Sequence, residues 1–544
     1  MRKLLVASGI LLLLSSAVHA QAPAIDVNNY VNIAEAPVVE SGGCRTSGYL
    51  GIVDNPYPCH TLEPCDVVVT TATTPTGDWT AISGEDTVCI VVGDHTGRGI
   101  LTIDGSGTSG DYRQYRCVNA DESRAAQPWD TTSENQCQVR GIDVDNDDFI
   151  VIDRFVPITV NATSAAAINT EAVSDFIVLN GIDADCSDLN TAEDGCFSLR
   201  GGDDIWLQRS VCDGVERNEG VDQMCISVRS GASDRVHIVM NDLSDATHEI
   251  QTQNVSEHRD LIIENNDIYR SDAVRQLATG NWPTNQSDTG IRQCGEGMLI
   301  FKEGGNDAGD AALVIHNRFS GQRAQGTGNS GAAQDCGGTG STAAPMISFS
   351  QVSSYVNVSR NIFGGDFSQA VRFLINDAGC GTTEICGNIT IDANLFHGQI
   401  RGDTGESANA IHFSSGEDDN NRITFNGFFN GEDNAAVNYM EQQGDNEVGC
   451  NIMFDAQNVT GTWGAGSGVQ DNNLYGGDTE APAGSSNTSG LAAGDLDDYT
   501  YFRNVLTTPV EVTVTNAWIT QAGADSLGDA GCAARTLTTG YGAE

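Results

Sequence analysis

The chain has 544 residues, and its 74 acidic residues far outnumber its 27 basic ones, which gives a formal net charge of −47. Such a charge excludes nucleic acid and anionic membrane surfaces as partners, because both repel an acidic protein. The acidic residues are spread along the chain, as expected for a protein of salty or calcium-rich surroundings. A polyanionic substrate would therefore need local positive charge or bound cations in order to approach.

Residues 1–20 have the pattern of a secretory signal peptide. Arg2 and Lys3 precede an apolar run over residues 4–14, and residues 18–20 form a small-residue cleavage site. We therefore predict a secreted protein, either extracellular or periplasmic. No later stretch reaches the roughly 20 apolar residues of a membrane helix, so no membrane insertion is expected.

All sixteen cysteines follow this segment, and an even number in an exported protein predicts disulfide bonds. The sequence contains no CxxC pair, which argues against a zinc site. The spacing leaves the connectivity open. Close pairs that could staple loops or neighbouring turns are Cys59 with Cys65, Cys186 with Cys196, Cys212 with Cys225, and Cys380 with Cys386.

An internal repeat indicates the fold class. Each copy has two apolar residues in alternation, then Asn, then an apolar residue two positions later. Clear copies lie at 236–243, 261–268, 356–363 and 389–396, with weaker ones at 175–182, 203–211, 311–319 and 421–429. Period-two alternation predicts short strands with one face inward, and stacked repeats bury a continuous core. We predict an all-β, right-handed parallel β-helix in which the repeated Asn, a residue that tolerates left-handed geometry, forms a ladder between coils.

The repeated position defines the expected coils. It falls at Asn180, Ser210, Asn241, Asn266, Asn317, Asn361 and Asn394. Most intervals fit one coil, the interval of 51 indicates two turns, and the interval of 44 indicates two short turns or one turn with a long loop. We expect a cap and first turns over residues 21–140, the helix core over 141–458, and loops with C-terminal strands over 459–544. A β-propeller is the alternative, but the internal signatures of its blades are absent.

One opening segment resembles a known family. The sequence DTVCIVVGDHTGRGILTIDGSGTSGDYRQYRC, residues 86–117, is similar to the first turns of bacterial pectate-lyase-like β-helix proteins. The resemblance implies the fold, and the superfamily includes lyases, hydrolases, epimerases and adhesive surface proteins.

A second segment points to a reaction. Residues 295–305, GEGMLIFKEGG, resemble the segment that holds the catalytic Lys of Lys-dependent pectate lyases and, more loosely, of alginate and chondroitin lyases. The resemblance implies that Lys302, the only lysine after residue 20, is the base that removes the proton alpha to a uronate carboxylate. Arg275 resembles the Arg base of another pectate lyase group, and it could instead bind a substrate carboxylate.

Calcium is the expected cofactor, since it would neutralise the substrate carboxylate. Glu296 lies near Lys302 in sequence, and SDATHEI, with Asp245 and Glu249, resembles the carboxylate-bearing turn of the Lys-dependent lyases. That family has a second aspartate where this chain has Ala246. Asp245, Arg275 and Lys302 are 30 and 27 residues apart, close to one coil each, which predicts that they stack in one groove.

Other motifs favour structural roles. Gly202-Asp203-Asp204 resembles the Asp pair of polygalacturonases, but the accompanying motifs are missing, so we interpret it as an Asp-rich start of a strand. The aromatic residues Trp206, Tyr269 and Phe363 are interpreted as core residues rather than sugar platforms.

The sequence therefore favours a monomeric, secreted, calcium-assisted lyase that acts on an anionic polysaccharide such as pectate or alginate. Two alternatives remain open. One is a non-catalytic surface or matrix protein that binds glycans or cations, and the other is a glycoside hydrolase or epimerase of the same fold.

Overall fold

The computed structural model describes the chain between residues 63 and 491 with gaps. The described residues are 63–72, 79, 87–109, 111–158, 166–170, 174–185, 195–200, 202–213, 224–229, 235–244, 246, 248–253, 261–269, 298–301, 312–320, 345–350, 354–364, 369–374, 387–397, 409–413, 421–424, 426–435, 437–439, 447–449, 451–457, 460–461, 469–471, 474–476 and 488–491.

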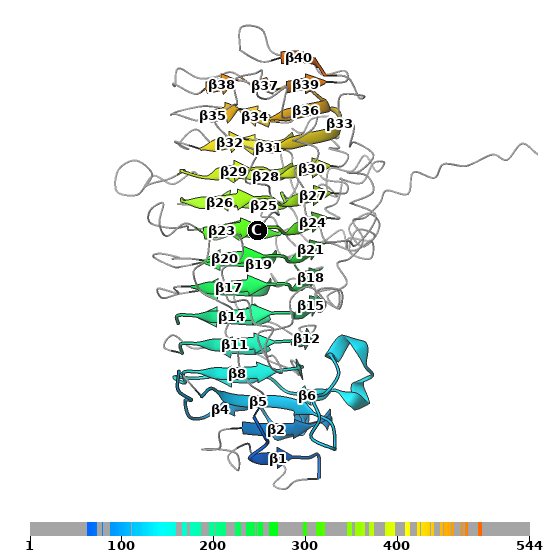
Figure 1. The fold of residues 1–544 in the computed structure, drawn as a ribbon, viewed down its shortest axis with the longest axis vertical. Helices are drawn as coiled ribbons and strands as arrows, with labels where there is room; N and C mark the ends of the chain where they lie inside the picture. Colours follow the sequence, from blue (N-terminus) through cyan, green and yellow to red (C-terminus); the bar gives the residue numbers. More distant parts are fainter. Residues whose placement is uncertain are drawn as a thin grey trace, which may run out of the picture.

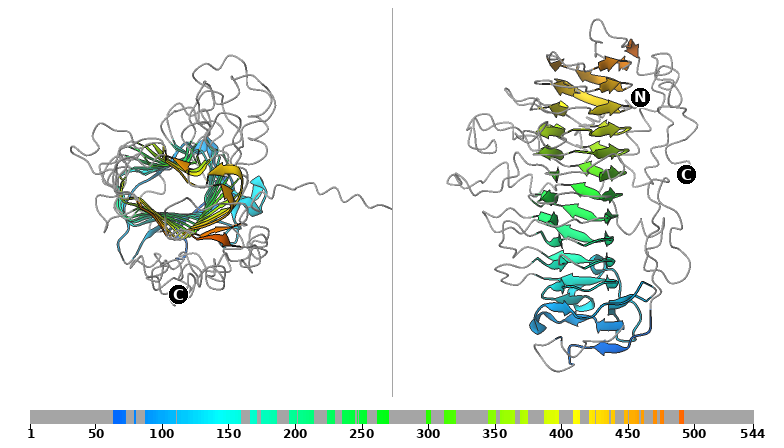
Figure 2. Two further views of the ribbon diagram at one scale, coloured as in Figure 1. Left: turned by 90° about the horizontal axis from the view of Figure 1, so that it is seen from above. Right: turned by 90° about the vertical axis from the view of Figure 1, so that its left-hand side faces the viewer.

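The strands are stacked coil on coil along one axis, and the cross-section seen from above is a closed ring (Figures 1 and 2). Each coil passes through three sheets, which we call sheet 1, sheet 2 and sheet 3 in chain order. Every pairing between the named strands is parallel, and each strand pairs with the equivalent strands of the coils before and after it. This confirms the predicted right-handed parallel β-helix.

Sheet 1 has twelve strands within the described ranges. They are β4 (Leu101–Ile103), β7 (Ile142–Val144), β10 (Ile168–Thr170), β13 (Phe197–Arg200), β16 (Met224–Arg229), β19 (His248–Gln253), β22 (Leu299–Phe301), β25 (Ile347–Ser350), β28 (Gln369–Leu374), β31 (Asn409–Phe413), β34 (Val437–Tyr439) and β37 (Thr460–Gly461).

Sheet 2 has fourteen strands in the same part of the chain. They are β1 (Val67–Val69), β2 (Thr87–Val91), β5 (Arg113–Val118), β8 (Ile150–Asp153), β11 (Ile177–Asn180), β14 (Ile205–Gln208), β17 (Val236–Val239), β20 (Ile262–Glu264), β23 (Ala312–Ile315), β26 (Val356–Ser359), β29 (Thr390–Asp392), β32 (Arg422–Thr424), β35 (Glu447–Gly449) and β38 (Val469–Asp471).

Sheet 3 has eleven strands among the described residues. They are β12 (Asp183–Asp185), β15 (Val211–Asp213), β18 (Asp242–Ser244), β21 (Asp267–Tyr269), β24 (Arg318–Ser320), β27 (Ile362–Gly364), β30 (Leu395–His397), β33 (Gly427–Ala435), β36 (Ile452–Gln457), β39 (Leu474–Gly476) and β40 (Thr488–Leu491).

A small three-stranded sheet lies at the N-terminal end of the stack. It contains β3 (Gly93–Asp94), β6 (Cys137–Val139) and β9 (Phe155–Pro157), and three short 3₁₀ helices accompany it, η3 (Thr96–Arg98), η4 (Pro128–Asp130) and η5 (Ser133–Asn135). No helix in the described part of the chain is long and apolar enough to cross a membrane.

The core is the interior of the coil, where the inward residue of each short strand meets its equivalent in the next coil. In sheet 3 the rings of Phe319, Phe363, Phe396 and Phe428 form one stack, with centroids 5.0, 4.7 and 4.7 Å apart and planes within 7° of parallel. All four side chains are buried. Each aromatic pair adds about 0.5–1.5 kcal/mol beyond the area that it buries. This confirms Phe363 as a core residue.

The Asn ladder lies at the turn between sheets 2 and 3. The side-chain Nδ2 of each ladder Asn donates to Oδ1 of the next one, at 2.9–3.1 Å from Asn241 to Asn451. Each Asn is buried, so these bonds satisfy polar groups that would otherwise be costly to bury. The left-handed residue is the one before the Asn, for example Met240 at φ 58°.

The ladder also corrects two predictions about the repeat. Asn180 pairs in register with Gln208 inside sheet 2, whereas the ladder position of that coil is Ile182, whose backbone N–H donates to Oγ of Ser210. The predicted second turn between Asn266 and Asn317 does not exist, since their side chains are directly bonded over an interval of 51 residues. The interval of 44 before Asn361 is likewise a single coil. Insertions, rather than extra coils, lengthen these intervals.

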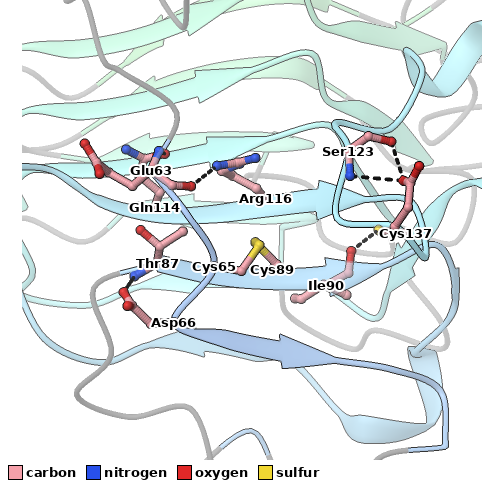
Figure 3. The surroundings of a disulfide bond; sticks show 11 residues. Glu63, Cys65, Asp66, Thr87, Cys89, Ile90, Gln114, Arg116, Ser123 and Cys137 are labelled. Carbon is pink, nitrogen blue, oxygen red and sulfur yellow. Dashed lines mark hydrogen bonds between the residues drawn. A yellow bond between two sulfur atoms is a disulfide. The ribbon is translucent and has the colours of Figure 1, made fainter. Parts of the chain in front are cut away.

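Three disulfides lie wholly within the described residues, Cys65–Cys89, Cys117–Cys137 and Cys212–Cys225. The last confirms one suggested pair. Cys65 bonds to Cys89 of β2 and not to Cys59, because Cys89 lies one coil away and directly beside it (Figure 3). Cys196 is disulfide-bonded, while the suggested partner Cys186 and the pair Cys380 and Cys386 lie outside the described residues.

Candidate functional site

Most of the residues predicted for the site lie outside the described residues, namely Lys302, Arg275, Asp245 and Glu296. Their predicted stacking in one groove therefore remains a prediction. The structure describes Phe301, which precedes Lys302 and is the last residue of β22 in sheet 1. It also places Glu249, which is in β19 of the same sheet and is fully buried.

The outer face of sheet 1 carries a row of side chains near β22 that are polar except for Ile300. Backbone pairing aligns Ser198, Ser227, Gln251, Ile300, Ser348, Arg372 and His412 on successive strands. Their neighbours in each strand point into the core, so alternation directs this row outward. Every member of the row is at most 8% exposed. Within the described structure, the hydroxyl oxygens of Ser227 and Ser348 have no hydrogen-bond partner.

Sheet 1 also concentrates positive charge in a strongly acidic protein. From β10 to β37 its described strands contain Arg200, Arg229 and Arg372 but one carboxylate, Glu249. Arg200 and Arg229 are paired in register, and Nε of the partly exposed Arg200 donates to Oγ of Ser198 at 3.0 Å. An arginine keeps its charge at any physiological pH and can bind a carboxylate with two parallel hydrogen bonds.

His412 adds a neutral polar group to this row. Burial lowers the pKa of His412 to about 4, and the neighbouring Arg372 guanidinium contributes to the lowering. The two residues are aligned on β31 and β28. At neutral pH the imidazole is therefore uncharged, and the positive charge at this end of the row belongs to Arg372.

Sheet 3 has the opposite charge. Its first four strands contain Asp183, Asp185, Asp213, Asp242 and Asp267 and no Lys or Arg. Alternation places these side chains on the outer face, because Ala184, Cys212, Leu243 and Ile268 between them are core residues.

Two aspartates of sheet 3 are adjacent and differ in environment. Asp242 and Asp267 are paired in register, which separates their backbones by about 4.8 Å. Arg318 holds Asp267 with two hydrogen bonds, Nε to Oδ1 at 3.3 Å and Nη2 to Oδ2 at 2.9 Å. Burial and the nearby Asp267 carboxylate raise the pKa of Asp242 to about 7, although a hydrogen bond from Tyr269 opposes the increase. Such a pair can supply a proton donor beside an ionised carboxylate.

Sequence reasoning missed this pair, although a signal was present. Asp242, Asp267 and Arg318 directly follow the ladder residues Asn241, Asn266 and Asn317. The residue after a ladder Asn begins a strand of sheet 3 and points outward. Tyr269 also lies on this outer face and is partly exposed, so its interpretation as a core residue was wrong.

No group of three or more His, Cys, Asp or Glu side chains within the described ranges is arranged to hold a metal ion. Glu249 is buried, and the other two expected calcium ligands, Asp245 and Glu296, lie outside these ranges. The described residues therefore do not form a calcium site, and calcium binding remains a prediction.

The remaining sequence motifs have structural roles. Asp204 lies just before β14, and its two carboxylate oxygens accept hydrogen bonds from Nε and Nη2 of Arg235 at 2.7 and 2.8 Å. Trp206 is nearly buried on the outer face of sheet 2, where it stacks on His237 with ring centroids 3.6 Å apart. Trp206 is thus inaccessible as a sugar platform, although it lies outside the central core.

No family model and no curated protein matches the chain. Among solved structures, the catalytic unit of a GH87 α-1,3-glucanase from Streptomyces thermodiastaticus is 11% identical, with a TM-score of 0.41, over 80% of this chain and 72% of that one. The Streptococcus pneumoniae surface protein and adhesin PfbA is 9% identical, with a TM-score of 0.34, over 75% and 91%. An alginate lyase from Paenibacillus is 11% identical, with a TM-score of 0.28, over 76% and 99%. Likenesses at this level carry no argument about the reaction.

Proposed function

We propose that this protein is secreted and acts on an anionic polysaccharide, and that it cleaves a polyuronate by β-elimination at the outer face of sheet 1. The observation that carries the proposal is the separation of charge between the sheets. Arginines and few carboxylates lie on sheet 1, and aspartates lie on the first strands of sheet 3. A polyanion approaching a protein of charge −47 would be attracted to such a basic face and repelled by the acidic strands of sheet 3.

The proposed base is Lys302, which follows the last residue of β22 in sequence. In β-elimination the base takes the proton on the carbon alpha to the uronate carboxylate, and the electron pair then expels the glycosidic oxygen and leaves a double bond. Negative charge builds up on the carboxylate during this step. Arg200, which is partly exposed, is a described group on this sheet that could stabilise such charge. Calcium would supply further charge neutralisation if the predicted ligands bind it.

The test uses the ultraviolet absorbance of the unsaturated product. Purified protein is incubated with pectate, alginate and glycosaminoglycans, with added calcium or with a chelator, and we expect absorbance to rise with at least one polymer. Lys302→Ala should abolish the increase and leave thermal unfolding nearly unchanged. Arg422→Gln, which alters an exposed arginine on sheet 2, is the matched control and should retain full activity. Absence of product with every polymer and both conditions would contradict the lyase proposal.

A hydrolase is the second candidate, and Asp242 with Asp267 is the observation that favours it. Hydrolysis of a glycosidic bond requires a carboxylic acid and a carboxylate, and the register of sheet 3 places these two aspartates on neighbouring strands. Hydrolysis releases new reducing ends without creating a double bond. Reducing ends without ultraviolet absorbance would therefore support the hydrolase over the lyase, and binding without either product would support a non-catalytic glycan-binding protein.

A further inference from the structure

We propose that residues 53–62 form a strap, an extended segment that docks on the outer face of sheet 2 and crosses it from β20 to β8. These residues lie outside the described ranges. The docking is independent of the reaction proposed above. Three features of the described residues support it: a buried row of side chains on sheet 2, the short connections that border this sheet, and the direction of the chain before β1.

The outer face of sheet 2 carries a row of mostly apolar side chains that are shielded from solvent. Register aligns them on the five strands from β8 to β20, as Val151, Val178, Trp206, His237 and Ile262. Their neighbours in each strand are core residues, so alternation directs the row outward. Each member of the row is nevertheless at most 6% exposed. Some other part of the chain must therefore cover this face.

The cover ends near β23. The same row continues with Leu313, Asn357 and Thr390, which are partly exposed, and with Arg422, which is exposed. The boundary between buried and accessible members lies between β20 and β23.

The connections within these coils are too short to supply the cover. Those that enter the five strands have four to eight residues, and those that leave them have one or two. The long insertions, residues 186–196, 214–223 and 270–298, join sheet 3 to sheet 1, which is the corner opposite to sheet 2. The partly buried Tyr112 packs against part of the row, but one side chain cannot span five strands.

The chain before β1 runs along this same face. Cys89 and Arg116 alternate with core residues and so point outward from β2 and β5. Cys65 is bonded to Cys89, and two residues earlier the carbonyl oxygen of Glu63 accepts a hydrogen bond from Nη1 of Arg116 (Figure 3). Val67, two residues after Cys65, begins β1. The chain thus crosses three successive strands of sheet 2 from β5 to β1.

This path sets the position of the strap. Two residues pass for each strand interval of about 4.8 Å, so the chain advances about 2.4 Å per residue along the stack. When the path is continued backward at the same pitch, residue 61 reaches β8 and residue 53 reaches β20. These are the first and last strands of the buried row.

The sequence of the strap suits an extended chain against an apolar face. Pro56 and Pro58 have a fixed φ and no N–H group, which favours an extended conformation and leaves fewer donors to satisfy. At the same pitch Tyr57 reaches β14, which contains Trp206, and Val53 reaches β20. The strap contains one acidic residue and no Lys or Arg.

The first test is photocross-linking of the full chain. Trp206→benzoylphenylalanine replaces one large aromatic side chain of the row by another, which bonds to neighbouring chain under ultraviolet light. We expect the cross-link to fall within residues 53–62, as identified by mass spectrometry of the digested protein. Asn357→benzoylphenylalanine, in the same row beyond the end of the cover, is the matched control and should not cross-link to these residues. Cross-links from position 206 to residues 492–544, to residues 270–298, to a second copy or to nothing would each overturn the proposal.

The second test is hydrogen exchange of the backbone amides. Val178→Asp places a carboxylate beneath the strap, and we expect residues 53–62 to exchange about tenfold faster or more in this variant. Asn357→Asp adds the same charge to the accessible part of the row and should leave their exchange unchanged. Thermal unfolding is measured for each variant, and Val178→Ala provides the test if Val178→Asp is unfolded. Exchange of residues 53–62 in the unaltered chain at the rate of an unstructured peptide, or at the same rate in the Val178 variants and the unaltered chain, would overturn the docking.

Discussion

Buried His237 should make the folded protein sensitive to acid. Its imidazole is 2% exposed and stacks on Trp206, and its Nε2 has no hydrogen-bond partner within the described structure. Burial lowers the pKa of His237 from 6.5 to about 3, and Arg235 adds to the effect. This lowering corresponds to about 5 kcal/mol against the charged form. A desolvated cation over an indole ring gains on the order of 2 kcal/mol, which is well below this cost, so desolvation outweighs the attraction to Trp206.

The direction of the pH effect follows from the two pKa values. Below pH 6.5 the unfolded chain binds a proton at His237 that the folded chain does not bind until the pH approaches 3. Stability is therefore present above pH 6.5 and is lost as the pH falls through this window. Between pH 8 and pH 5 the loss from His237 is about 2 kcal/mol, from the linkage of protonation to unfolding.

The assay is urea denaturation at pH 8 and pH 5. His237→Phe keeps an aromatic ring on Trp206 but cannot titrate, so its loss of stability on acidification should be about 2 kcal/mol smaller than that of the unaltered chain. Trp206→Phe is the matched control, since it retains the histidine and should retain the pH dependence even if it lowers stability. An equal pH dependence in the unaltered chain and His237→Phe would refute the reasoning.

Two further predictions concern sheet 3 and the ladder. The pKa of Asp242 is raised from 3.8 to about 7, so stability is lost as the pH rises through this window and the full cost is present above pH 7. Asp242→Asn should stabilise the protein at pH 8 by up to about 4 kcal/mol and give no benefit near pH 4. The measurement is denaturation of the variant and the unaltered chain at both pH values. A gain in stability that is the same at pH 8 and pH 4 would contradict the raised pKa of Asp242. Asn317 donates to Asn361 and to the Ile263 carbonyl oxygen and accepts from Asn266. Asn317→Ala should therefore lower the free energy of unfolding by about 2–4 kcal/mol, and a loss below about 0.5 kcal/mol would show that the ladder contributes little.

The parallel β-helix could be predicted from sequence because each coil repeats the same local rule. Alternation at Val236 and Ile238, followed by Asn241, specifies an inward face, a strand and a turn within a few residues. The number of coils between Asn266 and Asn317 could not be predicted in this way. Interval length does not distinguish a second coil from an insertion, and the hydrogen bond between the two side chains decides the question.

The candidate site was less accessible to sequence reasoning, because its chemistry depends on contacts between coils. Asp242 and Asp267 are 25 residues apart, and each appears in sequence as one more aspartate in an acidic chain. The register of sheet 3 brings them together, and the contacts of Asp267 with Arg318 and of Asp242 with Tyr269 distinguish their environments. The pairing of Cys65 with Cys89 depends on register in the same way.

The direct bond between Asn266 and Asn317 has a consequence for how such a protein can change. A coil of 51 residues closes on the same ladder as a coil of 25, so the cross-section is independent of the length of chain between ladder positions. Doubling the length of a flexible connection costs only about 0.6 kcal/mol of closure entropy. Segments within a coil can therefore be exchanged or extended by recombination while the scaffold beneath them stays constant. New specificities could arise here by grafting, without any redesign of the core.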